Sequence, residues 1–227
     1  MYLTNKINLS IDRARRPLAK THRSSEEIAK LLRRVVAPYR AYITTETSTN
    51  VDLGRIEVSA FFEPLPDTDT YAIELVLVTH PQTTSIKLRA LVLNTFLFRV
   101  SQAIQHELIH AHQYRQRGWE GWSSRKQAPY NISHSAHYLS DPDEIDAHAH
   151  DVALELQRSR LDVSRLISAR TITKDESLTL WGYYQTFPPH HGVINSLLKK
   201  TVSYLSLIHI SEPTRRYAIS YAVFCLK

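Results

Sequence analysis

The chain has 227 residues, which is enough for one domain with a sizeable apolar core. Its 28 basic and 22 acidic residues leave a formal charge of +6, and no apolar run reaches the length of about 18 residues that a membrane span needs. The only cysteine, Cys225, excludes an internal disulfide and a thiolate metal site, so any metal ligands are histidines or carboxylates.

The N-terminal segment, residues 1–23, is basic and lacks the apolar core of a signal peptide. Charge runs such as Arg13–Arg23 are usually exposed, so we interpret this segment as a flexible, solvated arm. Contact between this arm and nucleic acid is the less favoured alternative. We expect a cytoplasmic protein with no membrane partner.

The first predicted helix starts at a capping box formed by Ser24 and Glu27, and it ends before Pro38. Three segments after it are typical of β-strands: Ala41–Thr45, Arg55–Glu63 and Tyr71–Thr79. The second strand alternates apolar and polar residues, and Pro64–Asp67 predicts a turn after it. We expect an α+β fold with a small, mostly antiparallel sheet, whose edge strand could bind an extended peptide.

A long helix is predicted next, because neither proline nor glycine occurs from Ile86 to Arg117, and Gly118 then favours a helix end. Its apolar residues recur at helical spacing: Leu93, Phe96, Leu97, Val100 and Ile104. The second half of this helix contains the run His106-Glu107-Leu-Ile-His110. We therefore expect this run to lie on a partly buried helix.

Histidines four residues apart lie one turn apart on the same face of a helix. His106 and His110 can therefore bind one metal ion, usually zinc, while Glu107 is offset and can take a proton from a water on the metal. The spacing predicts metal-assisted hydrolysis with Glu107 as the catalytic base. The alternative is a pair of helix histidines that only form hydrogen bonds.

A catalytic zinc usually has three protein ligands, and Glu144 is the candidate for the third. Asp141 and Pro142 predict the start of a second helix, on which Glu144 and His148 share a face. The apolar stripe beside that face is expected to dock on the helix of His106: Ile145, Ala149, Val152 and Leu156. Two alternatives stay open, in which Glu144 is a capping-box residue, or His148 is the ligand.

The run from His106 to His110, followed by Glu144-Ile-Asp-Ala147, resembles the gluzincin metallopeptidases, especially the minimal ones of the ImmA/IrrE type. The resemblance implies a zincin-like fold, in which a small sheet packs on the helix that carries the motif His106 to His110, written HExxH, and a second helix supplies a glutamate. It implies Zn²⁺ as cofactor, with His106, His110 and Glu144 as ligands and Glu107 as general base. It covers residues 90–156 and departs at His148, where many relatives carry an aspartate.

We therefore expect a zinc-dependent metallopeptidase that hydrolyses a peptide or protein substrate through a zinc-bound water. A catalytically inactive, zinc-stabilised binding protein, which could contact nucleic acid, is the alternative. No oligomeric state follows from the sequence. The residues that could support a ligand or stabilise the oxyanion of the transition state are His137, Tyr138 and His148.

Three further helices are predicted at Leu161–Ala169, Ser177–Tyr184 and Gly192–Leu205. The expected metallopeptidase domain comprises residues 24–204. The tail, residues 205–227, resembles a translated transposase-type sequencing adapter. We expect this tail to be a library artefact of shotgun sequencing that replaces the natural C-terminus.

Overall fold

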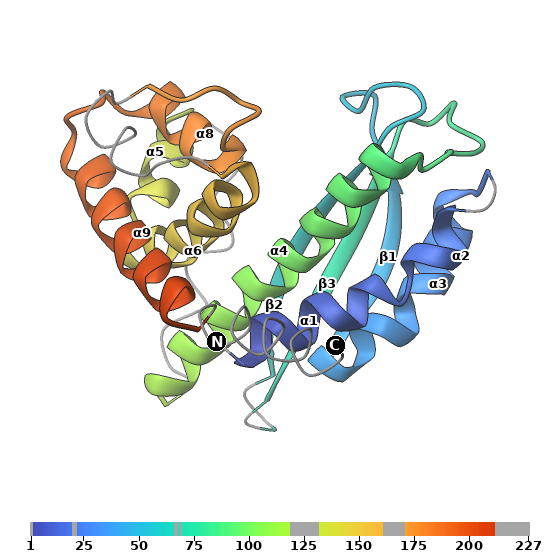
Figure 1. Cartoon of the computed structure of the whole chain (residues 1–227), viewed down its shortest axis with the longest axis horizontal. Coiled ribbons are helices and arrows are strands. Elements are labelled where there is room, and N and C mark those ends of the chain that lie inside the picture. The colour runs from blue at the N-terminus through green and yellow to red at the C-terminus, as the bar shows by residue number, and fades with distance from the viewer. Residues whose placement is uncertain are drawn as a thin grey trace, which may run out of the picture. The chain divides into compact units, whose positions relative to one another are not determined.

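A computed structural model describes residues 2–19, 22–65, 68, 70–118, 132–160 and 171–211 of the protein (Figure 1). The chain divides into two compact units, an N-terminal unit of Tyr2–Lys126 and a C-terminal unit of Gln127–Lys227. Each unit has a hydrophobic core of its own. The boundary falls inside residues 24–204, which we expected to form one domain.

The N-terminal unit contains a three-stranded sheet in the order β1-β3-β2. β1 (Ala41–Thr47) pairs in parallel with β3 (Thr70–Thr79), and β2 (Ile56–Leu65) pairs with β3 in antiparallel. All three predicted strands are present, and the sheet is mixed where we expected it to be mostly antiparallel. β3 is the central strand, and its second half carries apolar side chains on both faces.

The edge strand β2 alternates as predicted, with its even-numbered apolar positions the more buried ones. The strand continues through Pro64 and Leu65, where we expected a turn. An edge strand tolerates this proline, because the missing N–H can face away from the ladder. β2 is therefore longer than its sequence pattern indicated. The predicted α+β class is correct, because the unit combines helices with a sheet.

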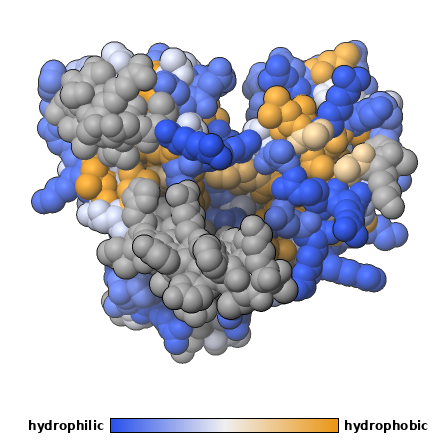
Figure 2. All heavy atoms as spheres, in the orientation of Figure 1, coloured by the Kyte–Doolittle hydropathy of each residue, from blue (hydrophilic) through white to orange (hydrophobic). Residues whose placement is uncertain are grey.

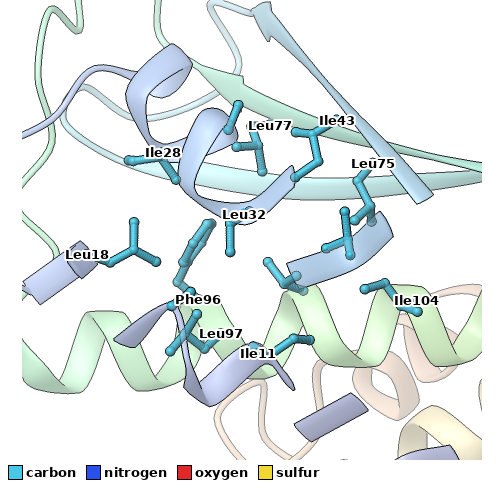
Figure 3. Packing of buried hydrophobic residues seen from close by; sticks show 14 of the residues in the cluster. Ile11, Leu18, Ile28, Leu32, Ile43, Leu75, Leu77, Phe96, Leu97 and Ile104 are labelled. Carbon is cyan, nitrogen blue, oxygen red and sulfur yellow. The ribbon is translucent and has the colours of Figure 1, made fainter. Parts of the chain in front are cut away.

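Helices cover one face of the sheet (Figure 1). α3 (Ser25–Val36) packs on β1, and α4 (Ala90–Gln116) packs on β2 and β3. Figure 3 shows apolar side chains of both helices, among them Leu32, Phe96 and Ile104, in the same core as Leu75 and Leu77 of β3. This packing fixes the first half of α4 against the sheet.

Both helices have the ends that their sequences predict. Ser24 and Glu27 form the two reciprocal hydrogen bonds of a capping box at the start of α3. After α4, Gly118 has a φ of 65°, a left-handed conformation that glycine adopts without a steric penalty. The short 3-10 helix η1 (Ala37–Tyr39) connects α3 to β1.

The N-terminal segment corrects our interpretation of residues 1–23 as a flexible arm. It forms α1 (Tyr2–Asp12) and α2 (Arg15–Ala19), which pack against α3 and α4. Four apolar side chains of this segment are at most 2% exposed: Ile7, Ile11, Ala14 and Leu18. They recur every three or four residues, so one face of the segment is buried in the core while its charged residues face outward.

The described helices of the C-terminal unit are α5 (Ile132–Leu139), α6 (Pro142–Ser159), α8 (Leu178–Thr186) and α9 (Gly192–Ser211). The apolar stripe of α6, which we expected to dock on the helix of His106, packs with side chains of α8 and α9. The predicted helices at 177–184 and 192–205 are therefore confirmed. The helix predicted at 161–169 lies outside the described residues.

The last helix, α9, continues through residues 205–211, which belong to the adapter-like tail, and Leu205 packs in the core of the C-terminal unit. Residues 212–227 lie outside the described part of the chain. Among the helices described, none combines the length and the apolar character that crossing a bilayer requires.

The surface of the N-terminal unit carries hydrophobic residues among hydrophilic ones (Figure 2). The most exposed large apolar side chains of this unit are those of Leu9, Leu53 and Leu91. Single exposed apolar side chains are common on protein surfaces, so they indicate no function by themselves.

Candidate metal centre

The HExxH motif, His106 to His110, lies in the second half of α4 and begins two residues after the core residue Ile104, and Leu108 within the motif also packs against that core. Because the helix continues without a break, the motif residues follow Ile104 into a buried position. His106 is 8%, Glu107 7% and His110 2% exposed. Polar side chains are buried at a cost unless they have partners, so three of them in one turn indicate a functional site.

The two motif histidines converge through one nitrogen each. Nε2 of His106 lies 3.1 Å from Nε2 of His110, and the ring planes are inclined at 74°. Two imidazoles on a tetrahedral zinc would have their nitrogens about 3.3 Å apart, given Zn–N bonds of 2.0–2.1 Å. The pair therefore fits the spacing of two ligands on one ion.

The outer nitrogen of His110 also has a partner on α4. Nδ1 of His110 lies 2.9 Å from the side-chain oxygen of Gln113, three residues further along the helix. An amide oxygen can only accept, so this contact places the ring proton on Nδ1 and leaves Nε2 with its lone pair. Gln113 was not among the predicted site residues, although its spacing from His110 is the i, i+3 spacing of helix neighbours.

The remaining motif residue, Glu107, follows His106 directly and is therefore rotated by about 100° around the helix. Its carboxylate does not share the line of His106 and His110. His112, which we interpreted as a non-ligating residue, is exposed and contacts Gln116, with 2.9 Å between the Nε2 atoms. The structure thus places His106, Glu107 and His110 in a buried turn and His112 on the surface.

The second set of candidate residues lies on α6, which begins as predicted with Asp141 as N-cap and Pro142 in the first turn. The Asp141 carboxylate accepts from the amide of Asp143 at 2.9 Å. In the alternative in which Glu144 is a capping-box residue, the Asp141 carboxylate would instead accept from the amide of Glu144. Glu144 is 9% exposed, and His148 lies one turn further along the same face.

His148 is held by two tyrosines. Its Nδ1 lies 3.1 Å from the hydroxyl oxygen of Tyr183 on α8, and its ring meets that of Tyr138 edge-to-face, with 6.0 Å between the ring centroids. Burial raises the pKa of Tyr183, and the nearby carboxylates of Glu144 and Asp151 raise it further. The phenol therefore keeps its proton at neutral pH.

Tyr183 was not among the predicted site residues. It is 1% exposed and lies three residues after the buried Leu180, so its position on the inner face of α8 was visible in the spacing. Its contact with His148 was not, because the two residues are 35 positions apart. Of the other candidate donors, His137 is exposed, and Tyr138 is 47% exposed.

Among the residues that the structure describes, His106, Glu144 and His148 are of the types that could hold a metal ion. Two imidazoles and a carboxylate suit zinc and also other divalent transition metals, so the donor set does not define the metal.

Comparisons of the chain with protein-family models, with characterised proteins and with solved structures gave no match.

Proposed function

We propose that the protein is a zinc-dependent metallopeptidase. The observation that carries this proposal is the pair of buried imidazoles on α4, whose Nε2 atoms lie 3.1 Å apart. Glu107, a buried carboxylate, directly follows the first of these histidines. Two convergent imidazoles with an adjacent glutamate are the residues that metal-assisted hydrolysis of a peptide bond needs.

In this proposal His106 and His110 supply two ligands, and Glu144 supplies the third. Three protein ligands leave one coordination position open, which a catalytic zinc requires and a structural zinc does not have. His148, like His106 and Glu144, is of a type that could hold a metal ion. It is therefore the alternative to Glu144 as third ligand.

When bound, the zinc ion would polarise the scissile carbonyl and lower the pKa of water toward about 7. Glu107 would take the proton of the attacking water and pass it to the leaving amine. With Glu144 as third ligand, His148 would donate a hydrogen bond to the oxyanion, because Tyr183 and Tyr138 hold its ring in place. His137 and Tyr138 are more exposed and are less well fixed for this role.

The sheet suggests how a substrate would bind. α4 packs along β2, and Phe62 of β2 packs with Ala111 and Tyr114, which lie one and four residues after the motif. Among the described strands, β2 pairs only with β3, so the backbone groups of its other edge are available. An extended peptide added to this edge would lie beside the metal-binding turn of α4.

The test uses the full-length chain loaded with zinc and a randomised peptide library read by mass spectrometry. Wild type is expected to bind one zinc ion and to cleave library peptides. Glu107→Gln is expected to bind zinc equally well and to lose at least about 100-fold in cleavage rate, because only proton transfer is impaired. His112→Ala, a change to an exposed histidine on the same helix, is the matched control and should alter neither property.

Full cleavage by Glu107→Gln, or a folded wild type without zinc, would contradict the proposal. Zinc binding that is lost in His106→Ala, with no cleavage of any peptide by wild type, would instead support the zinc-stabilised binding protein.

A further inference from the structure

We propose that Gln113 is a positioning residue, which fixes the tautomer and the orientation of His110 so that the Nε2 lone pair faces the metal. This inference rests on the proposed function, because it assigns a partner to one of the proposed zinc ligands. Gln113 would not touch the metal or the substrate. Its effect would be exerted entirely through the ring of His110.

The contact between Gln113 and His110 has a defined hydrogen-bond direction. The Gln113 side-chain oxygen lies 2.9 Å from Nδ1 of His110. A carbonyl oxygen has no proton to donate, so the imidazole must donate from Nδ1. A neutral imidazole carries a single ring proton, and Nε2 is therefore left as the basic nitrogen.

The basic nitrogen of His110 points toward the other histidine of the motif. Nε2 of His110 is the atom that lies 3.1 Å from Nε2 of His106. The hydrogen bond to Gln113 thus places the lone pair on the nitrogen that converges with the other histidine. If the proton moved to Nε2, His110 could not bind a metal through that atom without losing it.

The His110 ring is buried. His110 is 2% exposed, so little water can replace the Gln113 oxygen if that oxygen is removed. A buried donor without its acceptor carries a desolvation cost, and the ring would relieve this cost by changing tautomer or rotating. Partners of this kind on metal-binding histidines typically contribute 10–100-fold to metal affinity.

A second glutamine–histidine pair on the same helix provides the comparison. The side-chain nitrogen of Gln116 lies 2.9 Å from Nε2 of His112. Here the amide donates and the imidazole accepts, which is the opposite polarity, and the pair is exposed. A glutamine beside a histidine therefore does not by itself set the metal-binding tautomer, and Gln116 offers a matched control.

The experiment compares full-length wild type with Gln113→Leu, Gln113→Glu and Gln116→Leu. Zinc affinity is measured by competition with a chromophoric chelator, and the ring ¹⁵N shifts of His110 are recorded in the zinc-free protein. Gln113→Leu is expected to lower zinc affinity by about 10–100-fold and to produce a mixture of tautomers. Gln113→Glu keeps an acceptor oxygen and should have the zinc affinity and the His110 ¹⁵N shifts of wild type. Gln116→Leu should also match wild type in both.

Equal zinc affinity in Gln113→Leu and wild type would overturn the inference and leave the proposed metallopeptidase intact. A wild type that binds no zinc would instead overturn the proposed function. If Gln113→Leu does not fold, the ¹⁵N spectrum of wild type decides, because a proton found on Nε2 of His110 would contradict the assignment.

Discussion

The hydroxyl oxygen of Tyr183 lies 3.1 Å from Nδ1 of His148, which links α8 to the helix that carries Glu144. Tyr183 is fully buried, and its raised pKa keeps the phenol neutral. A neutral phenol can donate its proton to Nδ1, and the ring proton of His148 then stays on Nε2, the nitrogen that would donate to the oxyanion. α4 and α6 thus each contain a histidine whose Nδ1 contacts a polar side chain. His110 on α4 contacts Gln113 of the same helix, and His148 on α6 contacts Tyr183 of α8.

Tyr183→Phe tests this link, because it removes the hydroxyl and keeps the ring. We expect the free energy of unfolding to fall by about 1–3 kcal/mol, since Nδ1 of His148 loses this hydrogen bond in a largely buried setting. Chemical denaturation of the zinc-free protein measures the change. Tyr138→Phe is the control, because Tyr138 is 47% exposed and its ring meets His148 edge-to-face. An equal loss in both variants would argue against a specific role for the Tyr183 hydroxyl.

The identity of the third ligand can be decided by comparing Glu144→Ala with His148→Ala. We expect Glu144→Ala to weaken zinc binding by more than about 100-fold, because loss of a ligand exceeds the 10–100-fold loss of a supporting partner. His148→Ala should stay within the smaller range. Asp146→Asn is the control, since this carboxylate on α6 pairs with Lys200 at 2.8 Å. The reverse order of affinities would make His148 the third ligand.

Much of the fold follows from local sequence patterns. The capping box of Ser24 and the turn at Gly118 depend only on neighbouring residues, so their sequences predict them. The prediction of a flexible arm at residues 1–23 was wrong, because the segment contains isoleucines at helical spacing as well as arginines. The helical spacing of Ile7 and Ile11 predicts a helix with a buried apolar face. Burial of such a face stabilises a helix more than charged residues on the other face destabilise it.

The candidate site was predictable only in part, for a physical reason. His106, Glu107 and His110 lie in one helical turn, so spacing alone places them together. The roles of Gln113 and Tyr183 depend on which way an amide points and on how α8 packs against α6. Neither property has a signature in the order of residues.

The position of α8 depends on Glu155, a buried carboxylate on α6. It accepts from the hydroxyl of Ser177 and from the amide of Thr179, at the start of the helix that carries Tyr183. Glu155→Ala should lower the free energy of unfolding by about 2–4 kcal/mol, because buried donors lose their acceptor. Denaturation curves give the value, and Glu176→Ala serves as control, since Glu176 bonds Thr173 at an exposed position. No difference between these variants would contradict the anchoring role.

The contact between α6 and α9 makes stability depend on alkaline pH through Tyr204. Burial raises the pKa of Tyr204 above its ordinary value of 10.0, and the charge and hydrogen bond of Asp146 raise it further, followed by the charge of Asp151. Above pH 10 the unfolded chain therefore loses this proton while the folded protein keeps it. The unfolded state then binds fewer protons, so the free energy of unfolding falls as pH rises.

At neutral pH, Tyr204→Phe should lower the free energy of unfolding by about 1.5–3 kcal/mol, because a hydrogen bond to a charged group is lost. Above pH 10, the difference in the free energy of unfolding between wild type and Tyr204→Phe should narrow. Only wild type has this phenol, whose raised folded-state pKa makes wild type lose stability as pH rises. Denaturation at pH 8 and above pH 10 measures both differences. In an Asp146→Asn background the narrowing should be smaller, because one cause of the raised pKa is gone. If this difference in the free energy of unfolding instead widened with pH, folding would favour the ionised phenol, which would contradict the prediction.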